Sequence, residues 1–118
     1  MASEARIKKI NALIKREVGQ MILEELEFPA GVFATLTNVD TSLDLTDSKI
    51  EISVFPASKL AQALKILDSQ AGHLQHLLNR KLSLHFVPRI RFVPDKALGN
   101  AQKVEEILEN IKIEDTNL

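Results

Sequence analysis

The spacing of hydrophobic side chains divides the chain into six segments that alternate between helical and extended patterns. Residues 3–27 place apolar side chains three to four positions apart, which predicts an amphipathic helix with Ser3 as its N-cap. Residues 32–39 and 49–55 are rich in β-branched and aromatic side chains, and apolar and polar residues alternate in the second run. These two runs predict strands that pair antiparallel.

A second helical pattern continues through a glycine near its middle. We expect this helix to have Ser58 as its N-cap, to break at Ala71 and Gly72, and then to resume to about residue 80. The reason for the break is that a glycine inside a helix costs roughly 1 kcal/mol relative to alanine. The segment is therefore predicted to be two helices joined by a kink.

The last third of the chain predicts a strand and a helix. Residues 82–93 have a strand pattern that Pro88 interrupts, and because proline donates no ladder hydrogen bond, this strand should lie at a sheet edge or carry a bulge. Residues 97–112 have a helical apolar pattern. The order of elements predicts an α+β fold with a three-stranded sheet and helices on one face. We expect residues 1–118 to form one domain, with its core in residues 3–112.

The charged side chains are segregated along the chain, although the formal net charge is only −1. Basic residues concentrate in 1–20 and 73–96, and acidic residues in 24–51 and 101–118. If the basic segments meet in space they form a surface suited to a nucleic-acid backbone; otherwise they are ordinary solvated faces. The candidate contacts are Lys8, Lys9, Lys15, Arg16, Arg80, Lys81, Arg89 and Arg91.

The break at Ala71 and Gly72 is a further candidate contact. Glycine allows close approach of a backbone, and a helix that starts there would offer free N–H groups to phosphate; the alternative is a glycine that packs against the sheet. His73 and His76 follow and join the candidate set, but without a third ligand nearby we expect no metal site. The five phenylalanines lie mostly in strand or helix-end patterns and Trp and Tyr are absent, so we expect few base contacts.

Several classes of function have no support in the sequence. The absence of cysteine excludes disulfides, thiolate zinc sites and cysteine nucleophiles. The chain has no long apolar run and its start lacks the hydrophobic region of a signal peptide, so we expect a cytoplasmic protein that does not enter the membrane. It has no Ser-His-Asp set and no phosphate-binding glycine loop, so we expect no catalytic residue, no cofactor and no small-molecule substrate.

Four segments, taken in order, form a more specific pattern. The first helix opens with Arg6-Ile7, and residues 39–54 lead from Val-Asp through Ser-Leu-Asp-Leu into the alternating strand. Residues 69–74 contain the small-residue break, and residues 84–92 read Leu-His-Phe-Val-Pro-Arg-Ile-Arg-Phe. Over residues 3–112 the chain resembles the ribosome-binding factor A family of bacterial small-subunit assembly factors.

The resemblance implies a type II KH-like fold, in which a kinked helix pair replaces the helix–GxxG–helix clamp. It also implies a non-catalytic protein that binds the free small ribosomal subunit and its 16S ribosomal RNA, and that assists late RNA maturation and cold adaptation. We expect it to be a monomer. The competing hypothesis is a KH-like protein-interaction module that uses its acidic segments and does not bind RNA directly.

Overall fold

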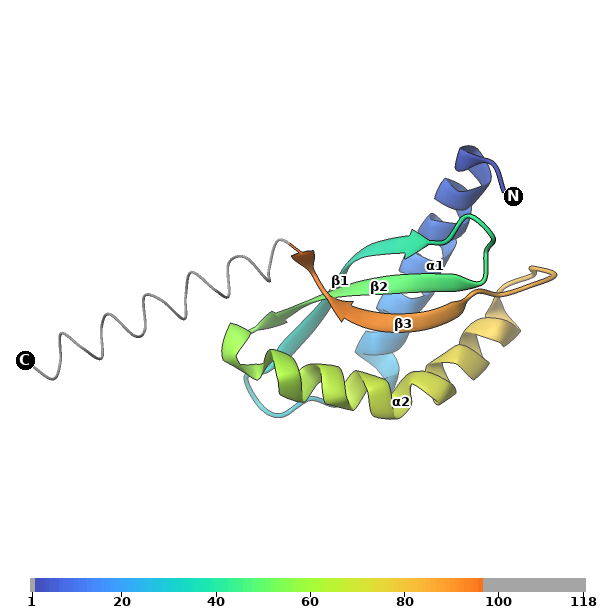
Figure 1. The fold of residues 1–118 in the computed structure, drawn as a ribbon. Coiled ribbons are helices and arrows are strands. Elements are labelled where there is room, and N and C mark those ends of the chain that lie inside the picture. The colour runs from blue at the N-terminus through green and yellow to red at the C-terminus, as the bar shows by residue number, and fades with distance from the viewer. Residues whose placement is uncertain (1, 97–118) are drawn as a thin grey trace, which may run out of the picture.

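The computed structural model describes residues 2–96, in which two long helices cover one face of a three-stranded sheet (Figure 1). The elements are α1 Glu4–Glu25, β1 Phe33–Thr41, β2 Asp47–Phe55, the 3-10 turn η1 Ala57–Lys59, α2 Leu60–Lys81 and β3 Arg89–Pro94. Strands β1 and β2 pair antiparallel, and β3 lies parallel to β2 in the order β1-β2-β3. The predicted α+β class and the antiparallel first pair are confirmed. The helix expected over 97–112 lies outside the described residues.

Helix α1 forms where its apolar spacing predicts. The Oγ of Ser3 accepts a hydrogen bond from the Arg6 backbone N–H at 3.2 Å, so Ser3 is the N-cap as expected. The helix ends at Glu25, two residues before the predicted end. The physical reason is packing, because the extended backbone at Leu26 places that side chain in the core.

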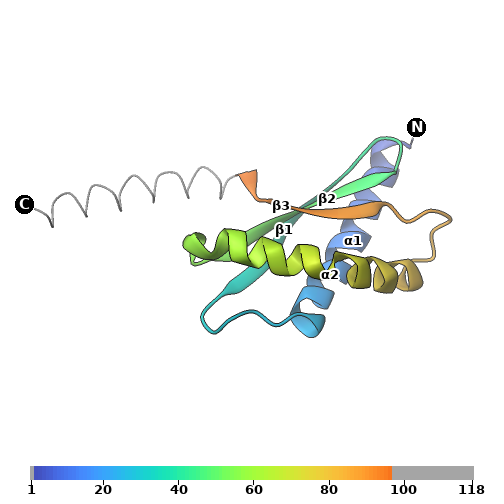
Figure 2. The same ribbon diagram turned by 60° about the horizontal axis from the view of Figure 1, so that its bottom comes forward.

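Helix α2 runs from Leu60 to Lys81 without interruption. The prediction that the helix breaks into two at Gly72 is therefore wrong. The axis of α2 instead turns near its middle, which Figures 1 and 2 show. Leu67 and Leu74 on either side of the glycine are fully buried, and their packing offsets the local cost of Gly72.

The expected N-cap of α2 is also wrong. Ser58 lies inside η1, and Lys59 takes the cap position without a side-chain hydrogen bond. The Lys59 N–H donates to the Pro56 carbonyl at 3.0 Å, so the chain already turns helically when it reaches Ser58. The prediction failed because the serine was read as the start of the α-helix, whereas a tighter turn precedes it.

Strand β3 is shorter than predicted, because residues 82–88 form the loop that follows α2. Leu82 is buried and Leu84 packs against the core, so this loop has strand-like apolar spacing although it pairs with no strand. Ladder pairing begins after Pro88, where the Arg89 N–H donates to the Thr46 carbonyl at 2.9 Å. The predicted edge position of this strand is confirmed.

The core lies between the sheet and the two helices. Alternation along β2 points Ile50 and Ile52 inward and Lys49 and Phe55 outward. Within residues 2–96 no helix covers the outward face of the sheet (Figure 2). Among the residues that the structure describes, no helix has the length and apolar character needed to span a bilayer.

Candidate nucleic-acid interface

A groove of about 920 Å³ separates strand β3 from the middle of α2. Three cationic side chains and the acid Asp47 line its sheet side, and small residues together with the acid Asp68 line its helix side. The residues that matter for its chemistry are Lys49, Arg89, Arg91, Asp47, Asp68, Ala71 and Gly72.

The three cations share one face because of strand alternation and register. In β3 the side chains of Ile90 and Phe92 enter the core, so Arg89 and Arg91 point outward. Arg91 is the register partner of Lys49 on β2. None of the three cations has an ion-pair partner within the described residues, so their charge is available to a ligand.

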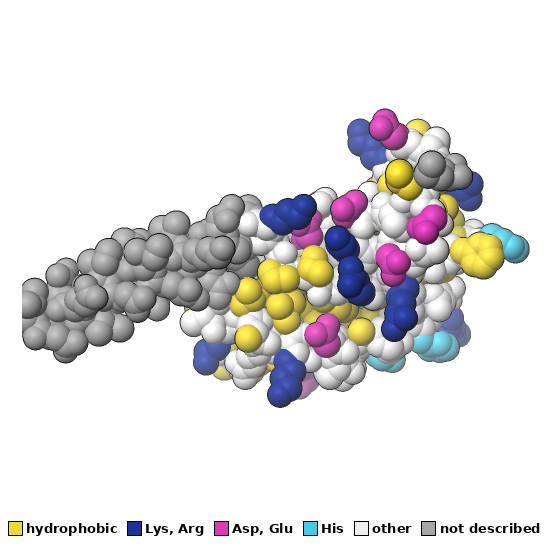
Figure 3. Space-filling view, in the orientation of Figure 1, with side chains coloured by type: hydrophobic (Ala, Val, Ile, Leu, Met, Phe, Trp, Pro, Cys, Tyr) yellow, Lys and Arg dark blue, Asp and Glu magenta, His cyan; other side chains and the backbone are white. Residues whose placement is uncertain are grey.

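The space-filling view shows this face of the molecule. Lys and Arg side chains gather near its centre, with acidic side chains around them and an apolar area beside them (Figure 3). The acids include the register partners of two cations, since Asp47 lies opposite Arg89 and Asp40 lies opposite Lys49. A ligand that binds here must therefore supply enough negative charge close to the cations to compete with the surrounding carboxylates.

The helix side of the groove is open at Gly72. A Cβ built at this glycine would meet no atom within 4 Å, so the alternative of a glycine packed against the sheet has no support in the structure. The expected free N–H groups are also absent, because α2 continues through this point and uses them in its own hydrogen bonds. The part of the prediction that the structure supports is that Ala71 and Gly72 line the groove with little or no side chain.

Gln75 fixes the distance between the two walls. Its Nε2 donates to the Pro88 carbonyl at 3.1 Å, and its Oε1 accepts from the Ile90 N–H at 2.8 Å. One side chain therefore ties α2 to the outer edge of β3. No pattern along the chain indicates this role of Gln75, because the role depends on α2 lying beside β3.

Three of the residues predicted to contact RNA instead lie close to carboxylates of α1. Arg16 Nε lies 3.3 Å from Glu17 Oε1, and Lys81 Nζ lies 3.8 Å from Glu17 Oε2. His73 Nε2 lies 3.5 Å from a Glu25 carboxylate oxygen. Lys81 and His73 thus link α2 to α1, and their side chains are at least half exposed.

The other predicted contacts are exposed on the two helices and do not line the groove. These residues are Lys8, Lys9, Lys15, His76 and Arg80. The structure therefore brings together four predicted residues, Ala71, Gly72, Arg89 and Arg91, and adds Lys49. Sequence reasoning missed Lys49 because its importance comes from the parallel pairing of β3 with β2.

Comparison with known proteins gives one consistent family. Residues 6–108 match the family model described as Ribosome-binding factor A. The chain is 32% identical over 116 residues to Ribosome-binding factor A of Microcystis aeruginosa, which covers 95% of this chain and 90% of that protein. It is 33% identical over 119 residues to the Pseudomonas syringae protein of the same name, covering 98% and 86%.

Two structures from Thermus thermophilus are similar to this chain. The crystal structure of ribosome-binding factor A has a TM-score of 0.66 at 25% identity, and the match covers 75% of this chain and 94% of that one. A homology model of the T. thermophilus protein, fitted into the cryo-EM map of a 30S–RbfA complex, has a TM-score of 0.63 at 28% identity. That match covers 73% of this chain and 91% of the other.

Proposed function

This chain belongs to the ribosome-binding factor A family, and from that premise we propose that it binds the free small ribosomal subunit through 16S ribosomal RNA. The observation that carries the proposal is the groove in which Lys49, Arg89 and Arg91 face the bare wall at Gly72. The T. thermophilus relative fitted into a 30S–RbfA complex supports the choice of partner.

The chemistry of the groove suits an RNA backbone. Each guanidinium offers several N–H donors in a plane and binds phosphate oxygens in pairs, while the ammonium of Lys49 acts as a point charge. The lack of bulk at Gly72 lets a strand of RNA lie against α2. Contacts of this kind fix position and orientation, and they carry little sequence information.

We further propose that this binding assists late maturation and processing of 16S ribosomal RNA, and that the protein contributes to growth in the cold. In this role the cations hold one arrangement of immature RNA, and the protein leaves when the mature arrangement excludes it. The protein acts as a cytoplasmic monomer, without catalysis, cofactor or small-molecule substrate.

The test is cosedimentation of the full chain with free small subunits, free large subunits and joined ribosomes over a series of salt concentrations. We expect binding to free small subunits alone, with affinity that falls as salt rises, because each neutralised phosphate releases counterions. Replacement of Arg89 and Arg91 by glutamine should weaken that binding.

The matched control is the double variant Lys59→Gln/Lys65→Gln, which removes the same charge from exposed positions that do not line the groove. It should bind nearly as the unchanged protein does. Equal loss in both variants would mean that general charge, rather than the groove, drives association. Binding to the subunit that resists salt and nuclease treatment would instead favour the protein-interaction module.

A further inference from the structure

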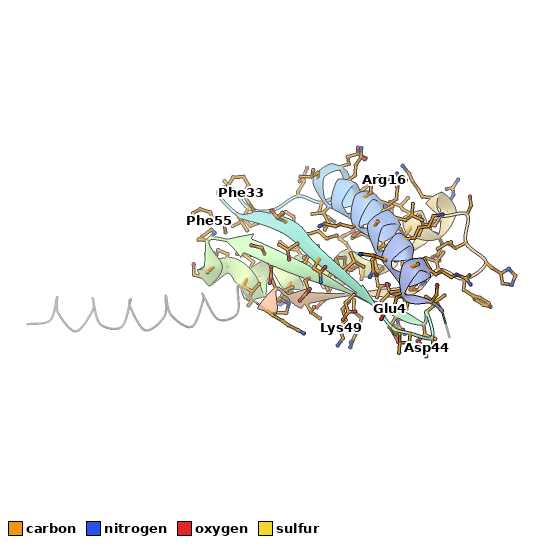
Figure 4. All side chains as sticks on the ribbon, turned by 90° about the horizontal axis from the view of Figure 1, so that it is seen from above. Glu4, Arg16, Phe33, Asp44, Lys49 and Phe55 are labelled. Carbon is orange, nitrogen blue, oxygen red and sulfur yellow. The ribbon has the colours of Figure 1, made fainter. Side chains whose placement is uncertain are left out.

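The outward face of the sheet carries an aromatic pair that the groove does not use. Phe33 of β1 and Phe55 of β2 are direct register partners, and their side chains are 64% and 70% exposed. Figure 4 shows them side by side at one end of the strands, with Lys49 toward the other end. Neither phenylalanine belongs to the core or packs against it.

Packing within the sheet does not explain why two phenylalanines lie side by side on its exposed face. The next outward-facing register pair is Thr35 with Ser53, and these small polar side chains suit a solvated face. Two adjacent exposed aromatic rings gain little from packing and lose the favourable burial that a core phenylalanine obtains. Contiguous exposed apolar side chains are enriched at binding surfaces, which makes the pair a candidate ligand contact.

The charge on the same face indicates the chemistry of the ligand. Lys49 and Phe55 are six residues apart on β2, so they point to the same side and lie about 20 Å apart at roughly 3.3 Å per residue. Arg91 lies beside Lys49 on β3, and the exposed acid Asp40 lies beside it on β1, so the cations exceed the acid at this end. The face therefore runs from a cationic end that opens into the groove to an aromatic end.

One acid lies between the two ends. Glu51 is half-buried, and its carboxylate accepts a hydrogen bond of 2.6 Å from the Asn38 side chain across the strands. This bond holds the carboxylate toward β1 and partly satisfies its charge. A ligand can therefore cross the face with phosphate groups at the cationic end and uncharged rings at the aromatic end.

We propose that the Phe33–Phe55 pair is a stacking platform for unpaired bases of an RNA strand whose backbone lies in the groove between β3 and α2. The proposal rests on the proposed RNA-binding function and deepens it by naming single-stranded RNA as the form that the sheet binds. Phenyl rings stack on any base, so the platform adds affinity for unpaired nucleotides without strong sequence preference.

The test compares a labelled single-stranded RNA of 12 nucleotides with the same RNA annealed into a duplex, by fluorescence anisotropy on the full chain. The variant Phe33→Leu/Phe55→Leu keeps apolar side chains and removes the π faces. We expect its affinity for the single strand to fall at least about fivefold, with duplex affinity unchanged, because each stacked base contributes measurably to binding.

The matched control is Phe86→Leu, which changes another exposed phenylalanine, 75% exposed, in the loop before β3. Its single-strand affinity should stay unchanged. A second measurement needs no variant: ultraviolet crosslinking of the unchanged protein to the single strand should modify peptides that contain Phe33 or Phe55. Crosslinks confined to other peptides would contradict the platform.

The outcomes separate this inference from the proposed function. If the leucine variant binds the single strand as before, while Arg89→Gln/Arg91→Gln weakens binding to small subunits, the platform is wrong and the function stands. If the unchanged protein binds neither RNA nor small subunits, both are wrong. If the leucine variant differs only in self-association by sedimentation, the aromatic pair is a contact between copies of the chain and the platform is again wrong.

Discussion

Gly72 is a helical glycine with empty space where a side chain would stand. Alanine at this position would reduce the freedom of the unfolded chain and favour the helix. It would also place a methyl group on the wall of the groove. Replacing Gly72 by alanine should therefore stabilise the protein and at the same time leave less room for a ligand in the groove.

We expect Gly72→Ala to raise the free energy of unfolding by about 0.5–1 kcal/mol in urea titration and to weaken binding to small subunits. Gly19 of α1 provides a matched control, because a Cβ there also meets nothing within 4 Å. Gly19→Ala should stabilise to a similar degree and leave binding unchanged. A Gly72→Ala protein that is stabilised and binds normally would show that the wall does not contact RNA.

Asp44 organises the loop between β1 and β2. Hydrogen bonds from the side chains of Ser42 and Thr46, and from the Thr46 backbone, lower the pKa of its carboxyl below the usual 3.8. The next residue, Leu45, has a positive φ of 62°, which side-chain-bearing residues rarely adopt. The charged form of Asp44 therefore helps to hold an uncommon turn.

The loop should remain formed well below neutral pH. Because the folded pKa lies below the unfolded pKa, the contribution of Asp44 is complete above the unfolded value and is lost as pH falls through the folded one. We expect an NMR titration of the Asp44 carboxyl carbon to give a midpoint below 3.8, and Ser42→Ala to raise it. A midpoint that does not move in Ser42→Ala would contradict the stated cause.

At the scale of elements, the joint between α2 and β3 rests on Gln75. Its two hydrogen bonds serve backbone groups of Pro88 and Ile90 on the outer side of the strand. We expect Gln75→Ala to lower the free energy of unfolding by about 1–2 kcal/mol, since it removes two partly buried hydrogen bonds. Hydrogen exchange at the Ile90 amide should become faster. Gln70→Ala, at an exposed position of the same helix, should change neither quantity.

The elements differ in how far the sequence determines them. Periodicity sufficed for α1, for β1 and for β2, because each has one buried face and a regular apolar repeat. It failed for residues 82–88, since apolar side chains that anchor a loop to the core have the same spacing as a strand. The parallel pairing of β3 depends on where α2 ends in space, and no local pattern of residues predicts that position.

The candidate site shows the same division. Alternation was enough to place Arg89 and Arg91 on one face, because the two residues are two positions apart on a strand. Their meeting with Lys49 and Gly72 requires the sheet register and the path of α2 together. The exposure of Phe33 could not be predicted, because a strand pattern does not say which aromatic side chain lies on the uncovered face.

For the whole molecule, segregation of charge matters more than its sum. The formal net charge is −1, so the proposed binding to RNA requires a local positive field, and the cations of the groove supply one. We expect Arg89→Gln/Arg91→Gln to reduce the slope of log affinity against log salt by roughly 1.5, at about 0.7–0.9 for each lost phosphate contact. Lys59→Gln/Lys65→Gln should leave the slope nearly unchanged. Equal slopes for the groove variant and the unchanged protein would mean that these arginines contact no phosphate.

The amide group of Gln75 has a consequence for the solubility of the protein. An edge strand presents unpaired backbone groups on which the strand of a neighbouring molecule can add, and this is a common route to aggregation. In β3 the Ile90 N–H and the preceding Pro88 carbonyl are occupied by Gln75, and Pro94 at the other end has no N–H to offer. A helix side chain and a proline thus reduce the backbone groups that this edge of the sheet offers to a fourth strand, so the addition of a neighbouring molecule along β3 is disfavoured by the fold itself.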